Sequence, residues 1–516
     1  MQNSMPTFRR NAVFLSSLIV VLAIIVYGLL DADGLETVST AMHAWIIHNF
    51  GWAYLLSTFL FLVFSLFLAI SKYGEIKLGE DHERPQYSYF GWFSMLFAAG
   101  MGIGLIFWGV AEPMSHYLNP AEQVAGSSGE AAGFAMRYSF FHWGLHPWAI
   151  YVVMSLSIAY FSFRRGMPML ISSCFYPLLG DRIFGTAGRA IDILAIFATV
   201  FGIVTSLGLG AMQITSGLGA VFGFESSYAI TLIVIAVVTV LFMISSMTGL
   251  DKGIQILSKT NILLALLLMA FMFIVGPSTF ILDIFSHTFA DYLTSLVTLS
   301  LSTNPFEGHT WTQSWTLFYW AWWISWSPFV GMFVASISRG RTIREFISAS
   351  LIVPPLLTFA WFCVFGGAAF QVEFDAGGLA AAVANDISTG LFKLYTHYPL
   401  TPVLSILTVM LLGVFFVTSA DSATYVLAMM SSNGDPLPSA AKKVTWALMI
   451  SGMAAILLYA GGLEALQRMA IAAALPFTLI MVLMCFCLYK GLQYESIAAG
   501  RSPSLSNTGS QESGDS

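Results

Sequence analysis

Long apolar runs, separated by short polar segments, extend along the chain from residue 12 to about residue 490. Each run approaches the roughly 20 residues that an α-helix needs to cross the hydrocarbon layer of a bilayer. Helices are favoured because lipid offers backbone N–H and C=O groups no outside hydrogen-bond partner. The alternating segments of about ten residues that typify outer-membrane barrels are missing. The pattern therefore predicts an all-α integral membrane protein with about twelve transmembrane helices.

The predicted membrane domain covers residues 12–490, between a short N-terminal segment, 1–11, and a Ser/Gly-rich tail, 491–516, that we expect to be disordered. The predicted spans are residues 12–30, 53–71, 89–111, 138–161, 190–220, 228–246, 258–281, 314–336, 349–370, 401–430, 443–461 and 468–489. The segment DYLTSLVTLSLSTNPF mixes apolar and hydroxyl residues over a length rather short for a crossing. It predicts an interfacial helix between the seventh and eighth spans.

The basic residues test this topology, because short cytoplasmic loops of membrane proteins collect Lys and Arg. Of the 21 Lys and Arg residues, only Arg137, Lys393 and Arg468 fall on the opposite side of the membrane from the others. The others are Arg9, Arg10, Lys72, Lys77, Arg84, Arg164, Arg165, Arg182, Arg189, Lys252, Lys259, Arg339, Arg341, Arg344, Lys442, Lys443, Lys490 and Arg501. We therefore expect both termini in the cytoplasm, a bacterial cytoplasmic (inner) membrane location, and an uncleaved first span.

Composition agrees with a bilayer as the main partner: 57% of the residues are hydrophobic and only 9% are charged. The net charge of −6 is spread along the chain, without the basic block of a nucleic-acid binder. The interior offers no nucleophile–base pair, metal-ligand set or phosphate loop, so we do not expect an enzyme. An ion channel would need a polar pore or carbonyl filter, whereas this interior is aromatic.

Two predicted spans carry helix-interrupting residues. The third reads MLFAAGMGIGLIFWGVAEP, with four glycines inside it, and the eighth contains Ser327, Pro328 and Gly331 at mid-span. Both are candidates for broken helices, five positions apart in the topology. This spacing predicts a repeat of spans 3–7 in spans 8–12, with spans 1–2 peripheral, as in many secondary transporters. The alternative is close helix packing through small residues.

Aromatic side chains concentrate in two spans. The eighth contains YWAWWISW, whose Trp residues lie away from either interface, unlike the interface-belt candidates Trp45, Trp52 and Trp311. The fourth contains FFHWGLHPWAIY, which places Trp143, Trp148 and Tyr151 within about 140° of arc. Faces of Trp and Tyr attract a quaternary ammonium, which cannot donate hydrogen bonds. The two clusters therefore predict a cage for a methylated cation.

Polar residues inside spans are a second set of candidates. Asp421 lies in the apolar stretch FFVTSADSATY, where an acid is expensive and usually functional, whereas Glu112 and Asp192 lie near span ends and are explained by solvation. His142 and His146 have the i, i+4 spacing of a zinc pair but no acidic or thiol partner nearby in the sequence. The oxygens around Thr418 suit a hard cation, with interhelical hydrogen bonding as the alternative.

The segments GMGIGLIFWGVAEP, HWGLHPWAIY, YWAWWISWSPFVG and FFVTSADSATYVL resemble hallmarks of the betaine/carnitine/choline transporter family. This resemblance implies a twelve-helix fold with an inverted five-helix repeat like that of the sodium-coupled neurotransmitter transporters. It also implies alternating access, a homotrimer, a small zwitterionic solute and no cofactor. Sodium is the coupling ion that the resemblance favours, and we expect no other metal.

Site residues follow from the same resemblance. The aromatic box around a trimethylammonium group would consist of Trp143, Trp148, Tyr151 and Trp323, with Trp326 on the same path. The carboxylate side of the solute would meet Met101, Gly102 and Gly104. A sodium ion would be held by Ala98, Met101, Phe415, Thr418 and Ser419.

The identity of the solute turns on Gly104. Choline carriers of the family tend to have an acid at this position, so glycine here favours a zwitterion such as glycine betaine imported by sodium symport. A proton-coupled choline carrier and a sodium-independent exchanger of carnitine, ectoine or dimethylsulfoniopropionate stay open. The short C-terminal tail, poor in charge, does not favour osmotic activation.

Overall fold

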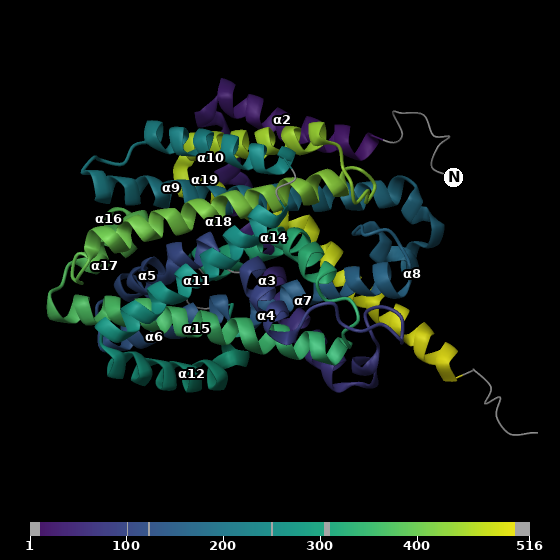
Figure 1. The fold of residues 1–516 in the computed structure, drawn as a ribbon, viewed down its shortest axis with the longest axis horizontal. Helices are drawn as coiled ribbons and strands as arrows, with labels where there is room; N and C mark the ends of the chain where they lie inside the picture. The colour runs from purple at the N-terminus through teal and green to yellow at the C-terminus, as the bar shows by residue number, and fades with distance from the viewer. Residues whose placement is uncertain (1–10, 101, 122–123, 249–250, 304–309, 501–516) are drawn as a thin grey trace, which may run out of the picture.

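The computed structural model describes residues 11–500 apart from 101, 122–123, 249–250 and 304–309. The longer helices run side by side as a bundle, and its described secondary structure is entirely helical (Figure 1). The helices are α2 Ala12–Leu30, α3 Ala32–Ile70, α4 Tyr89–Gly100, α5 Ile103–Leu118, α6 Gly129–Trp143, α7 Leu145–Ala159, α8 Tyr176–Leu179, α9 Thr186–Phe222, α10 Tyr228–Thr248, α11 Asp251–Val275, α12 Ser278–Leu301, α13 Thr310–Ser314, α14 Thr316–Ser336, α15 Ile343–Asp375, α16 Leu379–Asn385, α17 Gly390–Tyr395, α18 Thr401–Met430 and α19 Ala440–Gly500. The predicted all-α membrane fold is confirmed.

Within the described residues, eight helical stretches are long and apolar enough to cross a bilayer, and a bent pair adds a ninth. One of the eight, α19, contains both of the last two predicted spans. Between these spans Gly461 and Gly462 leave the helical conformation, so α19 is two helices joined at a kink. Gly462 has φ +60°, a left-handed value that glycine adopts without steric cost. Two predicted spans, 12–30 and 401–430, coincide with α2 and α18.

Several predicted boundaries were wrong, and two of them bear on the topology. Helix α3 begins at Ala32, well before the predicted residue 53, and Asp31 caps it by accepting a hydrogen bond from Gly34 N at 2.8 Å. Helix α11 stops at Val275 instead of 281. The chain then turns by 109° into α12, which contains most of the predicted interfacial segment. Such a bend is what a helix leaving the bilayer for the interface requires.

The third predicted span is broken, as expected. Helix α4 ends at Gly100 and α5 starts at Ile103, with Gly102 between them at φ −143° and ψ −120°. A Cβ atom built on Gly102 would lie 3.5 Å from the Phe415 ring, so the break packs directly against α18.

The eighth predicted span is not broken, which corrects the expectation from its Ser-Pro pair. Pro328 lies inside the continuous helix α14 and cannot donate to the carbonyl of Ile324, one turn earlier. The hydroxyl of Ser327 donates to this carbonyl instead, at 2.7 Å. A side chain therefore satisfies the group that proline leaves free, and the helix continues.

The fourth predicted span is interrupted instead, between α6 and α7. Gly144 separates the two helices with φ −95° and ψ −126°, and a Cβ atom there would lie 2.5 Å from Phe140 O. The Tyr292 hydroxyl accepts a hydrogen bond from Leu145 N at 3.1 Å, which satisfies a donor at the start of α7. Pro147 falls in the first turn of α7, where its missing N–H has no consequence. The interruption is therefore due to Gly144 and not to Pro147.

Helix α14 lies at the centre of the bundle and packs against α7, α9 and α19. Gly202 of α9 makes a close approach possible, because a Cβ atom there would lie 2.6 Å from Trp326 N of α14. Small residues allow backbones to approach in this way in membrane proteins.

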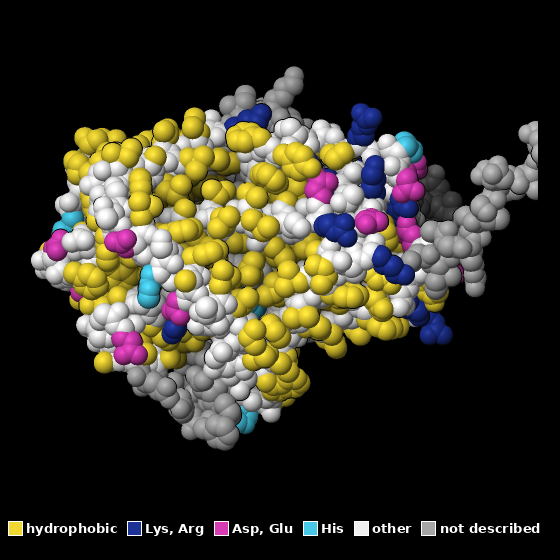
Figure 2. Space-filling view, turned by 90° about the horizontal axis from the view of Figure 1, so that it is seen from below, with side chains coloured by type: hydrophobic (Ala, Val, Ile, Leu, Met, Phe, Trp, Pro, Cys, Tyr) yellow, Lys and Arg dark blue, Asp and Glu magenta, His cyan; other side chains and the backbone are white. Residues whose placement is uncertain are grey.

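One end of the molecule is charged. Helix α2 begins and α19 ends at this end (Figure 1), and Lys and Arg side chains gather there, while hydrophobic side chains cover the middle (Figure 2). Arg339 donates to Glu83 at 2.7 and 2.5 Å, and Arg164 donates to Asp81 at 2.6 Å. These hydrogen bonds lower the pKa of the Glu83 and Asp81 carboxyls below their ordinary values. The pairs attach residues 71–88 to two other loops of the charged end.

We expect Ser327→Ala to lower the stability of the protein by about 1 kcal/mol, because it leaves the Ile324 carbonyl buried without its hydroxyl donor. Thermal unfolding in detergent measures the change. The double variant Ser327→Ala/Pro328→Ala restores a backbone N–H to this carbonyl and should recover most of the loss. Equal stability of Ser327→Ala and the unsubstituted protein would contradict this account of the continuous helix.

Candidate functional site

The predicted aromatic cage is assembled from three helices. Trp143 ends α6, Trp148 and Tyr151 lie on α7, and Trp323 and Trp326 lie on α14. The Trp323 ring centroid is 4.9 Å from that of Trp143 and 6.3 Å from that of Tyr151. Tyr151 also contacts Trp148 at 5.6 Å and Trp326 at 6.3 Å. All five side chains are buried, so the structure brings the whole predicted set together.

A small cavity of about 10 Å³ lies beside these rings. It is lined by Gly102, Ile103, Gly104, Trp143, Ser206, Trp322, Trp323, Trp326 and Ser419. Its volume is about that of one water-sized probe, so the surrounding side chains are closely packed. The cavity joins the α4–α5 break to the aromatic face of α14.

Trp148 and Tyr151 belong to the ring cluster but do not line this cavity. Their polar atoms, Trp148 Nε1 and Tyr151 Oη, are buried and have no hydrogen-bond partner among the described residues. Buried donors are normally paired, and an unpaired one is costly. These two atoms are therefore candidates for contact with a polar group of a solute.

The predicted sodium-site residues of α18 lie next to the α4–α5 break. Ser419 lines the small cavity together with Gly102, and Phe415 packs against Gly102. The Thr418 hydroxyl donates within its own helix to Val414 O at 2.9 Å. Met101 lies outside the described residues, and so does the side chain of Ala98.

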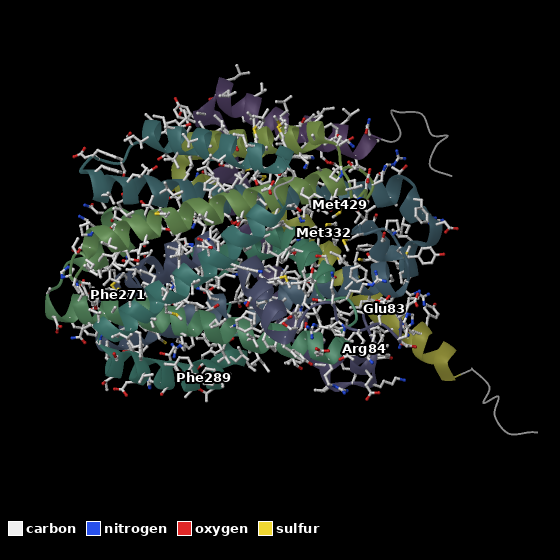
Figure 3. The ribbon with its side chains drawn as sticks, viewed as in Figure 1. Glu83, Arg84, Phe271, Phe289, Met332 and Met429 are labelled. Atoms are coloured by element: carbon white, nitrogen blue, oxygen red, sulfur yellow. The ribbon has the colours of Figure 1, made fainter. Side chains whose placement is uncertain are left out.

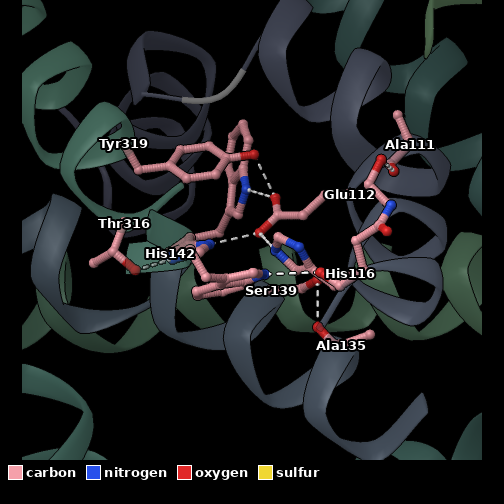
Figure 4. A network of polar contacts seen from close by, with 12 residues as sticks. Ala111, Glu112, His116, Ala135, Ser139, His142, Thr316 and Tyr319 are labelled. Carbon is pink, nitrogen blue, oxygen red and sulfur yellow. Dashed lines mark hydrogen bonds and ion pairs between the residues drawn. The ribbon is translucent and has the colours of Figure 1, made fainter. Parts of the chain in front are cut away.

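Glu112 is completely buried, which corrects its interpretation as a solvated residue near a span end. Four hydrogen-bonding side chains surround its carboxylate (Figure 4). Trp143 Nε1 and Tyr319 Oη donate to Oε2 at 2.7 and 2.5 Å. His142 Nδ1 and His116 Nε2 lie 2.7 and 3.2 Å from Oε1.

The expectation that His142 has no acidic partner was wrong. Glu112 is that partner, and it comes from a different helix, α5. His142 Nε2 pairs with the Thr316 hydroxyl at 2.9 Å, which fixes the ring from its other side. His146 points elsewhere: its Nε2 pairs with Ser300 of α12 at 2.9 Å. His142 and His146 therefore do not face a common position for a metal ion.

The other two candidate acids have different surroundings. Asp192 is 5% exposed, not solvated as expected, and it accepts hydrogen bonds from Ser172 N and Oγ at 3.0 and 2.8 Å. Asp421 lies in the wall of a second cavity of about 510 Å³, with Ser422, Lys443 and the methionines Met169, Met332 and Met429. Two of these methionines, Met332 and Met429, lie between the centre of the molecule and its charged end (Figure 3).

Residues about one helical turn apart, on each of α14 and α18, line the two cavities. On α14, Trp326 lines the small cavity, and Phe329, which contacts it at a centroid distance of 6.0 Å, lines the large one. On α18, Ser419 and Ser422 are divided between the cavities in the same way. The aromatic site is thus closed from the larger cavity by the Trp326–Phe329 pair.

Several residues of the site were not predicted from the sequence. Trp322 stacks on Trp323 at 4.4 Å, and its Nε1 lies 3.3 Å from the Ser206 hydroxyl of α9. Tyr319 stacks on His142 at 4.6 Å and donates to Glu112. Trp322 and Tyr319 were visible in the motif FYWAWWISW, but nothing in the sequence singles out Ser206.

Comparison with known proteins gives one consistent result. The model of the betaine/carnitine/choline family transporters matches residues 12–497. The glycine betaine transporter OpuD of Bacillus subtilis is 49% identical over 94% of this chain and 95% of its own length. The ectoine/hydroxyectoine transporter of Virgibacillus pantothenticus is 44% identical over 92% and 95%. Glycine betaine transporter 1 of Vibrio parahaemolyticus is 44% identical over 95% and 94%.

The family model covers nearly the whole chain, and the fold is an all-helical membrane fold. The buried residues around Glu112 therefore belong to a transporter and not to an enzyme. The chain belongs to the betaine/carnitine/choline family of transporters.

Proposed function

We propose that the protein imports a small zwitterion with a quaternary-ammonium group, glycine betaine in the first place, by sodium symport with alternating access. The observation that carries the proposal is the buried ring cluster of Trp143, Trp148, Tyr151, Trp323 and Trp326. The names of relatives that share almost the whole chain support the same solute class.

The chemistry of the cluster suits such a solute. A trimethylammonium group has no N–H to donate, so it is attracted by the faces of aromatic rings, at about 2 kcal/mol or more per desolvated contact. Its carboxylate needs donors, and Trp148 Nε1 and Tyr151 Oη are buried donors without a partner in the described chain. Ectoine is the second candidate solute, because a relative named for it is 44% identical.

Sodium coupling is supported by the position of α18 beside the broken span. Ser419 lines the cavity at the α4–α5 break, and interrupted helices free backbone carbonyls that coordinate cations in transporters. Oxygen atoms are the ligands that hard cations prefer. The proposed ligands are still the backbone and hydroxyl oxygens of Ala98, Met101, Phe415, Thr418 and Ser419.

The two cavities support a closed site with an exit toward the charged end. A cavity of about 10 Å³ holds about one water molecule, so a solute enters only when the rings separate. The 510 Å³ cavity lies beyond Trp326 and Phe329, on the side of Lys443. We propose that this end is cytoplasmic, as the positive-inside rule indicates, and that both termini lie there in a protein of the inner membrane. We also propose the homotrimer that is usual in the family.

The proposal is tested by uptake of labelled glycine betaine into proteoliposomes under an inward sodium gradient, a proton gradient, or neither. We expect accumulation only with sodium. Accumulation driven by protons alone would replace sodium by proton coupling, and uptake without a gradient would indicate exchange. If glycine betaine is not taken up under any condition and ectoine is, the transported solute is ectoine.

We expect Trp323→Ala to abolish solute binding, because it removes the ring that contacts both Trp143 and Tyr151. Binding of labelled betaine to purified protein measures this. Trp45→Ala, at an exposed tryptophan of α3, is the matched control and should bind normally. Unchanged binding by Trp323→Ala in folded protein would contradict the aromatic cage.

We expect Gly104→Ala to weaken both folding and solute binding. Its Cβ atom would lie 2.7 Å from Trp322 and 3.0 Å from Trp143, and overpacking of this kind costs about 1–3 kcal/mol. Gly133→Ala of α6 is the control, because a Cβ atom there meets no described atom within 4 Å. Thermal unfolding and betaine binding of both variants would show the difference, and equal behaviour would refute the close packing at Gly104.

A further inference from the structure

We infer that the buried carboxylate of Glu112 makes the aromatic cage selective for positive charge, by holding Trp143 and raising the electron density of its ring. This inference rests on the proposed quaternary-ammonium solute. It adds a positioning residue that does not itself line the cavity.

The first step is the state of the carboxylate. An ionised carboxylate is only an acceptor, with about four lone-pair positions on its two oxygens. Trp143 and Tyr319 donate to Oε2, and His142 Nδ1 and His116 Nε2 lie 2.7 and 3.2 Å from Oε1, where the tautomer with its proton on that nitrogen donates. The indole N–H of Trp143 can only donate, so Oε2 of Glu112 is the acceptor in this contact. The surroundings therefore match the negatively charged form of Glu112.

The second step is the connection from Glu112 to the cage. Trp143 donates directly to Oε2 at 2.7 Å, and the same ring lines the small cavity. His142 pairs with Oε1 at 2.7 Å through its side chain, and its backbone carbonyl accepts from Trp323 Nε1 at 3.0 Å. Two cage rings are thus fixed through their indole N–H groups: Trp143 by Glu112, and Trp323 by the backbone of His142.

The third step is the electrostatic effect. A hydrogen bond to a charged acceptor is shorter and stronger than a neutral one, and hydrogen-bonded groups polarise one another. Donation to an anion shifts electron density into the indole ring, and a cation is attracted by the negative face of that ring. The site is fully buried, where a low effective dielectric constant preserves the effect.

A purely structural role for Glu112 makes a different prediction. If the carboxylate only holds the rings in place, its loss should weaken every ligand of the same shape equally. If it also favours positive charge, its loss should weaken a trimethylammonium compound more than the isostere in which an uncharged tert-butyl group replaces the trimethylammonium group. The isostere of glycine betaine is 3,3-dimethylbutanoate, which has the same shape and the same carboxylate.

The experiment measures the dissociation constants of both compounds, by calorimetry or competition with labelled betaine, for the unsubstituted protein and for Glu112→Gln. We expect the ratio of the two constants, isostere over betaine, to fall about tenfold in Glu112→Gln. Asp192→Asn, at a buried acid of α9 outside the aromatic cage, is the matched control and should keep the ratio. An unchanged ratio in folded Glu112→Gln would overturn the inference.

A second variant decides the question if Glu112→Gln does not fold. Trp143→Phe keeps a ring in the cage but cannot donate to Glu112, so the ratio should fall by more than in Trp323→Phe, which makes the same ring change at a tryptophan that donates to a backbone carbonyl. An equal fall in the two variants would overturn the inference. Where all variants fold, Glu112→Gln and Trp143→Phe combined should lower the ratio no further than either alone. Failure of the unsubstituted protein to bind betaine at all would instead remove the proposed function.

Discussion

Every polar group that this chain places inside the bilayer has to be satisfied by the chain itself, because lipid supplies no donors or acceptors. The described structure meets this requirement at two irregular points of the backbone, although the side-chain donors Trp148 Nε1 and Tyr151 Oη have no partner in it. Ser327 supplies a hydroxyl where Pro328 removes an N–H, and Tyr292 supplies one where Gly144 interrupts the fourth span. The carboxylate of Glu112 is satisfied by donors from three separate helices. The helices that carry the aromatic cluster are thereby held in a single arrangement.

The aromatic cluster also depends on residues that have no side chain. Gly202 allows the backbone of α9 to approach α14 at Trp326, and Gly104 leaves room for the rings of Trp322 and Trp143. Large rings bury much apolar surface but pack only where a neighbouring residue is small. The glycine-rich stretches and the tryptophan-rich stretch are therefore complementary parts of one site.

The sequence predicted the all-helical membrane fold, several spans and the aromatic residues, because each depends on composition within one segment. It failed where the outcome depends on contacts between segments. A Ser-Pro pair looks the same whether the helix breaks or, as in α14, the serine satisfies the free carbonyl. The partners of Glu112 lie up to 207 residues away, so its burial could not be read from its place near a span end. The polar start of α3 was missed because the helix continues beyond its most apolar part.

The shared use of Glu112 has a consequence for how such a protein can diverge. Each oxygen of the carboxylate has two partners, so a change at residue 112, 116, 142, 143 or 319 disturbs the other four, and we expect these positions to change together. Ser419 lines the cavity outside this set, so a change there alters the polarity of the site alone, whereas a side chain at Gly104 would meet Trp143 and Trp322. Solute preference can therefore drift through single substitutions at the cavity wall while the scaffold behind it is inherited unchanged. Relatives named for glycine betaine and for ectoine, at similar distances from this chain, are compatible with that division.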